Sequence, residues 1–403
     1  MVIELVKIMH RIVYLLCLGH LVVDLNNGAL PVLLSVLQEA FRLSYTAVGS
    51  AVLIANLSSS IIQPVFGLLS DRFSFRWLIP VGAIAASGGL ALAGLAPSYA
   101  VVLVGVFLSG LGIAAFHPEG SRVTFHASGA RKGAAAAIFS IGGNIGFGLG
   151  PMLAAALIAW QGRGGMVGLL VPAAIMGGAL WLAMPAMQRA TAADEASFKK
   201  AATTDGRSGG NWPAMALLTA LVTLRSWTHF GVMTFLPLYY KNHLQLGTDS
   251  GATLLTVFLL SGAVGTLVGG PLADKWGRRN LMILSFSLVM PALLALPYVS
   301  GVWSLLATAV AGFMIVATFS VSVVFAQELL PRNVGLASGL VMGFAIGMGG
   351  VGTVLLGYVA DHLGLLRALN VVGLLPLLML GMTFCLPRRP EGSQTRGQTA
   401  LAS

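Results

Sequence analysis

Four side chains that can bind a proton lie within long apolar stretches of the sequence. His20 and Asp24 are four residues apart, so a helix would place them one above the other on one face. His117 and Glu119 occur together near the end of another stretch. An acid in apolar surroundings is costly to keep ionised, and it is therefore suited to taking up and releasing a proton. We predict that Asp24, His20, Glu119 and His117 are proton-coupling residues.

Both pairs also have plainer interpretations. His20 and Asp24 could be a buried polar pair whose members only hydrogen-bond to each other and have no further role. The second surrounds Pro118 and is followed by Gly120, so a break in the helix could bring its two side chains together, which a regular helix would not do. The plain alternative is a helix that ends here, with Arg122 beyond the apolar stretch.

A further group of polar side chains could bind an anion. Arg225 lies in an apolar stretch that contains no carboxylate, and His229 follows it by four residues, with His117 expected nearby. A guanidinium group binds a phosphonate or carboxylate through two parallel hydrogen bonds. The alternative is an ion pair between Arg225 and an acid of another helix, Asp24 or Glu119. The residues that we predict to contact a substrate are Arg225, His229, Asn27, Asn144 and Arg122.

The elements that carry these residues are predicted to be membrane-spanning helices. Hydrophobic residues make up 57% of the 403 residues and charged residues only 9%, and a water-soluble surface needs far more charge. The mean hydropathy is +0.88. Apolar stretches long enough to cross a bilayer, at roughly 20 residues each, recur at 11–39, 44–69, 77–96, 98–121, 133–160, 165–187, 212–240, 250–273, 280–299, 302–328, 335–360 and 364–387. We therefore expect an all-α integral membrane protein with twelve transmembrane helices in two six-helix bundles.

The basic residues indicate an orientation in the membrane. The formal net charge of +10 could suggest a nucleic-acid partner, but the positions of the bases argue against one. With the N-terminus in the cytoplasm, eighteen of the 23 lysines and arginines fall in or beside cytoplasmic segments, as the positive-inside rule describes. Both termini would then be cytoplasmic. The predicted division is an N-terminal bundle at 1–187, a cytoplasmic linker at 188–211, a C-terminal bundle at 212–387 and a disordered cytoplasmic tail at 388–403.

One ten-residue pattern occurs twice, beginning at Gly67 and again at Gly270. A repeat at half the chain length is typical of a duplicated membrane bundle. The pattern Gly-x-x-x-Asp-[Arg/Lys]-x-Gly-[Arg/Lys]-[Arg/Lys] resembles the loop between the second and third helices in each half of major facilitator superfamily transporters. The first copy departs from it, with Ser74 for the glycine and Phe75 for a base. The resemblance implies a conformational latch formed by Gly67, Asp71, Arg72, Arg76, Gly270, Asp274, Lys275, Gly277, Arg278 and Arg279.

The stretch at 133–160 carries a ridge of small residues. Gly142, Gly146 and Gly150 recur at every fourth position, which lets another helix approach closely, and Pro151 supplies a bend. Gly-x-x-x-Gly-Pro resembles the fifth-span motif of proton-coupled exporters in the same superfamily, although Ala154-Ala155 replaces the glycine pair that usually follows. The resemblance implies an antiporter helix formed by Gly142, Gly146, Gly150 and Pro151.

Three segments together resemble one branch of the superfamily. They are Gly19-His20 with Asp24, the segment 116–120 (Phe-His-Pro-Glu-Gly) and the segment 138–144 (Ile-Phe-Ser-Ile-Gly-Gly-Asn). They resemble the fosmidomycin-resistance branch, whose members export a phosphonate antibiotic. The resemblance implies proton-coupled efflux of a small anionic or amphiphilic compound across the bacterial inner membrane. Two other kinds of transporter stay open as alternatives: an uptake symporter for an organic anion or sugar, and a broad exporter of lipophilic cations.

Other classes of protein are disfavoured. No Gly-x-x-x-x-Gly-Lys-[Ser/Thr] loop occurs, so ATP is not the expected energy source. Cys17 and Cys385 have no cysteine or histidine at ligand spacing, and no residue cluster resembles a catalytic centre, so we expect neither a metal site nor a cofactor nor an enzyme. A scaffold or sensor would not require titratable pairs inside lipid. The expected partners are a small-molecule substrate, protons and the lipid bilayer, without nucleic acid, and the chain is expected to act as a monomer. The segment 357–361 repeats Gly-x-x-x-Asp but would lie outside the cell, and we assign it no role.

Overall fold

The computed structural model describes residues 11–63, 66, 75–128, 132–201, 210–245, 248–330, 337 and 339–388, of which 132–134 and 192–201 are described by their backbone only. Every regular element among these residues is helical, which confirms the all-α class. The elements of the first half are α2 (Arg11–Ala40), α3 (Tyr45–Asn56), η1 (Leu57–Ile61), α5 (Leu78–Leu95), α6 (Tyr99–Ala127), α7 (Lys132–Gln161), η2 (Gly162–Leu169) and α8 (Leu170–Ala201). Those of the second half are α9 (Trp212–Asn242), α10 (Thr248–Trp276), α11 (Arg278–Ala295), η3 (Leu296–Tyr298), α12 (Val302–Leu329), η4 (Gly339–Ala345), α14 (Gly349–Leu363) and α15 (Leu365–Cys385).

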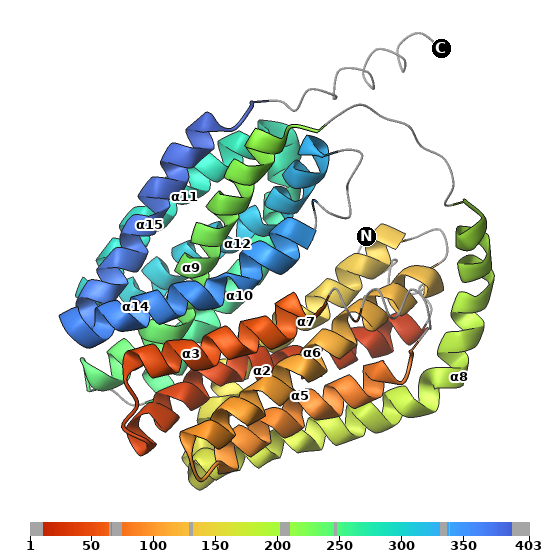
Figure 1. Cartoon of the computed structure of the whole chain (residues 1–403), viewed down its shortest axis with the longest axis horizontal. Coiled ribbons are helices and arrows are strands. Elements are labelled where there is room, and N and C mark those ends of the chain that lie inside the picture. The colour runs from red at the N-terminus through yellow and green to blue at the C-terminus, as the bar shows by residue number, and fades with distance from the viewer. Residues whose placement is uncertain are drawn as a thin grey trace.

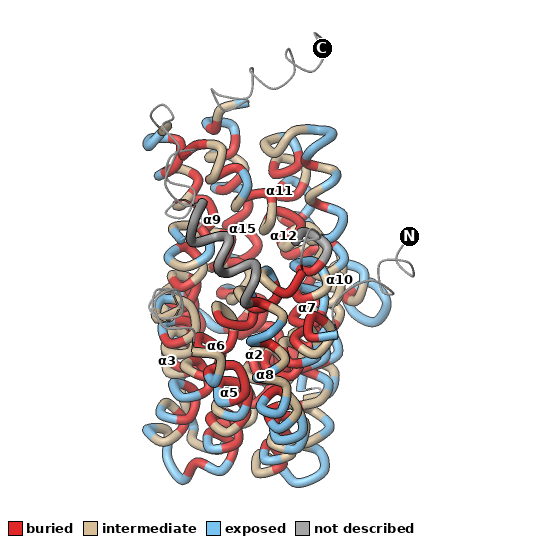
Figure 2. Tube along the Cα trace, turned by 90° about the vertical axis from the view of Figure 1, so that its right-hand side faces the viewer, coloured by how far each residue is buried: buried red, intermediate tan, exposed pale blue. Residues whose placement is uncertain are grey.

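Each predicted apolar stretch coincides wholly or in part with one of these helices. Nine helical spans within the described residues are long and apolar enough to cross a membrane, and one of them, Ala135–Thr191, takes in both α7 and α8. Large apolar side chains such as Ile175, Leu182 and Trp303 are exposed. Buried positions face the interior of the helix bundle and exposed positions face outward (Figure 2). An outer surface of this composition belongs in lipid.

Two helices extend beyond their predicted ends. α6 continues through Pro118 to Ala127, so the predicted break in this helix is absent. A proline removes one backbone hydrogen bond, but α6 packs closely against α5, and this packing holds it helical. α8 runs to Ala201 and includes the first part of the segment 188–211, which we predicted as a linker. Alanine, glutamate and lysine are frequent in that part of the sequence, and all three favour helices.

The helices form two groups, α2 to α8 and α9 to α15, which meet where α3 packs on α14 and α7 packs on α10 (Figure 1). The groups diverge toward the end at which α2 begins and α15 ends, which we call the terminal end. The opposite end, at residues 35–49, 241–242 and 353–361, is the closed end. Small residues permit the close approach there: a Cβ at Gly49 would collide with the backbone of Thr353, and one at Gly357 with the backbone of Tyr45.

Polar contacts join the two groups at the closed end. Asp361, near the end of α14, accepts hydrogen bonds from the backbone N–H groups of Tyr45 and Thr46, at 2.6 and 2.9 Å, and from the Thr46 hydroxyl, at 2.6 Å. Tyr45 and Thr46 begin α3, and the first N–H groups of a helix have no partner within it. Lys241 of α9 adds an ion pair with Glu39 of α2 at 2.7 Å. Asp361 therefore caps a helix of the other group.

Replacing Asp361 by asparagine should make the closed end open more often, because the positive end of α3 loses its charged partner. A loss of about 1–2 kcal/mol changes a two-state ratio about 5- to 30-fold. Distances between spin labels on α3 and α14 would measure the ratio in a background that lacks Cys17 and Cys385. Asp249→Asn is the matched control, since Asp249 is exposed near the start of α10. Equal ratios in Asp361→Asn and the parent would contradict the capping role.

Candidate functional site

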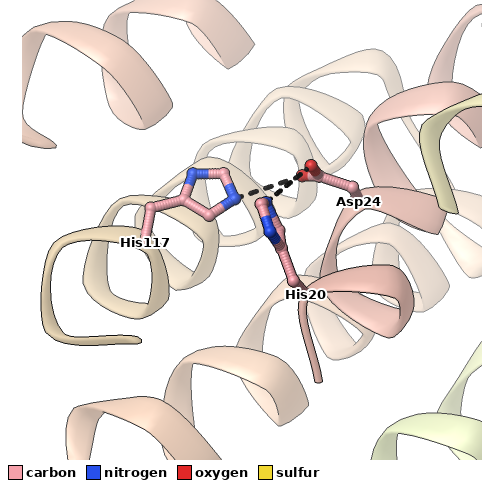
Figure 3. A group of neighbouring side chains, drawn as sticks. All are labelled: His20, Asp24 and His117. Carbon is pink, nitrogen blue, oxygen red and sulfur yellow. Dashed lines mark ion pairs between the residues drawn. The ribbon is translucent and has the colours of Figure 1, made fainter. Parts of the chain in front are cut away.

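The carboxylate of Asp24 lies between two imidazoles. Asp24 Oδ2 is 3.1 Å from Nε2 of His20, one turn earlier in α2, and Asp24 Oδ1 is 3.2 Å from Nε2 of His117 in α6. Both rings point at the carboxylate (Figure 3). The Asp24 side chain is 14% exposed. The spacing of four residues thus brings the predicted pair together, and the packing of α6 on α2 adds His117.

Two further groups hold this cluster of His20, Asp24 and His117. Asn27 donates a hydrogen bond from Nδ2 to Asp24 Oδ1 at 2.9 Å. His20 Nδ1 lies 2.8 Å from the backbone carbonyl oxygen of Phe139 in α7, and the two rings stack with centroids 4.2 Å apart. Asn27, which we predicted to contact a substrate, is therefore engaged with the acid in this conformation. The arrangement places a sequestered acid beside two bases that can share a proton with it.

The same three side chains have the composition of a metal site. One ligand atom from each of His20, Asp24 and His117 lies within 4.8 Å of the others. The Asn27 N–H, however, points at the carboxylate oxygen that faces His117. A hydrogen bond of this kind stabilises the ionised carboxylate and is compatible both with metal binding and with proton sharing. We refer to the group as the proton-binding cluster, and its role in proton coupling stays a prediction.

Glu119 takes no part in this cluster. Its side chain is fully buried and accepts two hydrogen bonds from Arg122, at 2.6 Å to Oε1 and 3.1 Å to Oε2. Glu119 and Arg122 are three residues apart in a continuous α6, which also keeps Glu119 off the face that carries His117. The prediction that a break brings His117 and Glu119 together is therefore wrong.

A second charged group, Arg225, is buried in α9. Arg225 is 3% exposed, and its Cζ lies 4.9 Å from the centroid of the Phe319 ring in α12. Its Nη1 has no hydrogen-bond partner among the described residues, and none of the carboxylates that the structure describes pairs with it. The alternative of an ion pair with Asp24 or Glu119 is therefore not realised in this conformation. A buried guanidinium with an unused donor is costly, so the site favours a further acceptor.

His229 lies one turn after Arg225, at the boundary between the two groups of helices. The centroid of its ring is 6.2 Å from that of Phe147 in α7 and 5.4 Å from that of Phe258 in α10. His117, which we expected near Arg225, contacts Asp24 instead. The structure thus keeps Arg225 and His229 together in the second half and places His117 with the acid in the first.

Comparison with known proteins assigns the chain to a family. The sequence profile of the Major Facilitator Superfamily matches residues 16–344 and 215–401. The chain belongs to the Major Facilitator Superfamily. It is 35% identical over 372 residues to the fosmidomycin resistance protein of Escherichia coli (strain K12), covering 92% of this chain and 91% of that protein. It is 33% identical over 383 residues to the uncharacterized MFS-type transporter YfnC of Bacillus subtilis (strain 168), covering 94% and 93%.

Solved structures share the fold of this superfamily member at low sequence identity. A bacterial homolog of the human lysosomal transporter Spinster, in an inward-facing and occupied conformation, aligns with a TM-score of 0.74 at 14% identity, covering 94% of this chain and 97% of that one. The xylose transporter XylE from E. coli, in an inward-open conformation, aligns with a TM-score of 0.74 at 14% identity, covering 97% and 99%. The protein is therefore a multi-pass membrane transporter with the major facilitator fold.

The second copy of the predicted latch makes its described contacts within one half of this transporter. Arg278 pairs with Glu328 at 2.6 Å and with Asp274 at 3.6 Å, which joins the ends of α10, α11 and α12. Arg279 donates to two backbone carbonyl oxygens at the end of α15. Gly277 has a φ of +86°, which only glycine adopts readily, and it begins the turn into α11. The role of these residues as a latch stays a prediction.

The remaining latch positions are two residues of the second copy with few neighbours, and the residues of the first copy. Gly270 has open space around it, and Lys275 is exposed. Arg76 donates to the hydroxyl of Thr191 in α8 at 2.8 Å. This contact also stays within one half of the transporter. The positions of the first copy that lie outside the described residues are Gly67, Asp71 and Arg72.

The glycine ridge of α7 lies against the backbone of α2. Each ridge glycine faces a carbonyl group, and the facing pairs are Gly142 with Cys17, Gly146 with Leu21, and Gly150 with Leu25. Pro151 lies beside Gly28 at the end of this contact. Asn144, a predicted substrate contact, is half-buried on α7. The ridge thus sets α2 and α7 backbone to backbone, which fixes the wall of the proton-binding cluster.

One residue of this wall, Gly143, is absent from our predicted site. A Cβ at Gly143 would lie 2.8 Å from Asp24 Oδ2 and closer still to Nε2 of His20. Gly143 is one position off the four-residue spacing of the ridge. A glycine next to Gly142 that the ridge does not require could have pointed to this position in the sequence. Its contact with His20 and Asp24 of α2 explains why a glycine stands there.

Proposed function

We propose that this transporter exports a small anionic or amphiphilic compound, such as a phosphonate antibiotic, in exchange for protons. The observation that carries the proposal is Asp24, an acid inside a membrane-spanning helix held between His20 and His117. Ionisable residues at such positions mark proton and ion pathways, because lipid does not tolerate them without a function or a partner. Similarity over nearly the full length to the fosmidomycin resistance protein supports efflux of a phosphonate.

Arg225 is the group that we expect an anion to bind. It is buried, and Nη1 lacks a hydrogen-bond partner among the described residues. His229, one turn away, adds a second basic group on the same face of α9. A phosphonate would complete the hydrogen bonds of the guanidinium and offset part of the free energy that its burial costs. These features favour an anionic substrate over a lipophilic cation.

Transport would proceed by alternating access of a central site from the two sides of the membrane. The two groups of helices are joined at the closed end and diverge at the terminal end. With both termini in the cytoplasm, as the positions of the bases indicate, the end at which the two groups diverge faces the cytoplasm. In each cycle the Asp24 cluster would bind a proton from outside and release it inside. The proposed location is the bacterial inner membrane, and the proposed state is a monomer.

Reconstitution of the purified protein in liposomes with an imposed pH gradient tests this function. The panel should contain fosmidomycin, an organic anion, a sugar and a lipophilic cation. Phosphonate movement opposite to the proton flow, with protons exchanged for substrate, is the expected result. Movement of an anion or sugar with the protons would favour the symporter, and movement of lipophilic cations alone would favour the broad exporter. Transport indifferent to the gradient would contradict proton coupling.

A further inference from the structure

We propose that α7 determines where the proton of the His20–Asp24 pair lies, through the backbone carbonyl of Phe139 and the missing side chain of Gly143, so that both are positioning residues. The inference rests on the proposed function, because it concerns the cluster that we expect to bind the transported proton. It adds a condition to that function. In this geometry His20 can face Asp24 only while a proton lies between them.

The tautomer of His20 follows from its two partners. A backbone carbonyl oxygen accepts hydrogen bonds and cannot donate them, so the 2.8 Å contact with Phe139 requires a proton on Nδ1 of His20. A neutral imidazole carries one N–H, so Nε2 then presents a lone pair. That lone pair lies 3.1 Å from Asp24 Oδ2, which is also an acceptor when the acid is ionised. The two atoms stay in contact only if a second proton lies on Nε2 or on Oδ2.

Other groups around the pair do not replace that proton. His117 of α6 faces the opposite carboxylate oxygen, Oδ1, and Asn27 of α2 donates to Oδ1 as well. Cys17, one turn before His20 in α2, lies beside the backbone of α7 at Gly142. Among the described residues, therefore, His20 is the partner of Asp24 Oδ2.

Gly143 keeps the pair in contact with α7. A Cβ at this position would lie 2.8 Å from Asp24 Oδ2 and would overlap Nε2 of His20. Phe139, one turn earlier, stacks on the imidazole and supplies the carbonyl oxygen. The two positions are four residues apart, so they lie on one face of α7. Any side chain at position 143 would force the two proton-sharing atoms out of place.

Release of the proton must then change a contact between helices. Without it, the lone pair of His20 Nε2 and the ionised Asp24 Oδ2 repel each other. We expect the ring to leave Asp24, because giving up the Phe139 carbonyl would leave a buried acceptor without its partner. A ring that moves away from Asp24 also shifts on the Phe139 ring on which it stacks, so the contact of α2 with α7 changes. The protonation state of the cluster is therefore linked to the packing of α2 against α7.

Nitrogen NMR of the purified full-length protein with 15N-labelled histidine would report the tautomer. The chain has 7 histidines, and His20→Asn identifies the His20 signals by their loss. We expect Nδ1 of His20 to keep its proton throughout the titration, while Nε2 alone gains and loses one. A neutral His20 with its proton on Nε2 overturns the inference whatever the transport assay gives. Absence of pH-driven transport by the parent protein would instead overturn the proposed function.

Gly143→Ala tests the positioning role. A displacement of about 1 Å can slow a reaction about 100-fold, so we expect a loss of that order in pH-driven efflux, with exchange at equal pH retained. The His20 nitrogen signals should shift in the same variant. Gly178→Ala in α8 is the control, because no atom would lie within 4 Å of its Cβ. Parent-like efflux and parent-like His20 signals in Gly143→Ala overturn the inference, and if that variant does not fold, the tautomer of the parent protein decides.

Discussion

Replacing Asp24 by asparagine should abolish efflux driven by a pH gradient and leave exchange of substrate at equal pH in place. Asparagine has nearly the same size and keeps an oxygen that can accept the Asn27 hydrogen bond. It cannot bind and release a proton, and Asp24 is the acid in contact with both His20 and His117. The cluster would therefore keep its packing and lose its coupling. Liposome assays with and without a pH gradient separate the two effects.

The Asp24 prediction has an internal control, because exchange at equal pH uses the same protein in the same membrane. Asp249→Asn adds a second control, since it removes a carboxylate from an exposed position near the start of α10. If pH-driven efflux persists in Asp24→Asn, Asp24 is not the proton carrier. Glu119, which is fully buried in α6, would then be the next residue to test.

Replacing Arg225 by lysine should weaken phosphonate binding by about tenfold or more. Lysine preserves the charge but cannot form two parallel hydrogen bonds with one anion. A hydrogen bond to a charged group contributes about 1.5–3 kcal/mol, and 1.4 kcal/mol corresponds to a factor of ten in Kd. Arg225 also stacks on Phe319, a contact that a flexible ammonium reproduces poorly. Calorimetry with the purified protein measures the change.

Arg163→Lys is the matched control for Arg225→Lys. Arg163 also lies over a phenylalanine ring, that of Phe41 at 5.2 Å, but its Nη1 already donates to the carbonyl oxygens of Gly94 and Ala96. The Arg163→Lys variant should therefore bind phosphonate with nearly the affinity of the parent protein. Equal affinities in the parent and in Arg225→Lys would exclude Arg225 from the substrate site, and tighter binding of lipophilic cations than of phosphonate would indicate the broad exporter.

Local spacing was sufficient to predict the elements and the first pair of the site. The apolar stretches match the helices because bilayer thickness and backbone hydrogen bonding leave few alternatives. His20 and Asp24 were recognisable because a helix brings positions four residues apart onto one face, and the structure has them 3.1 Å apart. The same rule would have paired Glu119 with Arg122, three residues apart, had a break at Pro118 not been expected.

Spacing within one helix could not predict which residues meet between helices. His117 joins Asp24 because α6 packs on α2, and periodicity within either helix contains no information about that orientation. Pro118 does not end α6, because tertiary packing compensates for the one missing backbone hydrogen bond. Gly143 matters through the side chains of another helix, and Asp361 through the start of α3 in the other half. Each of these roles depends on the folded arrangement.

The cap on α3 depends on the sequence of α14 far more than on the sequence of α3 itself. Two of the hydrogen bonds that Asp361 accepts come from the main chain, at Tyr45 and Thr46. No substitution at those two positions removes them except proline, which lacks the N–H group. A random-mutagenesis search for a loosened closed end should therefore recover many different changes at position 361, and at 45 and 46 chiefly proline. Sequence change in α3 other than to proline keeps both main-chain hydrogen bonds and removes at most the one from the Thr46 hydroxyl, whereas one codon in α14 is enough to remove them all.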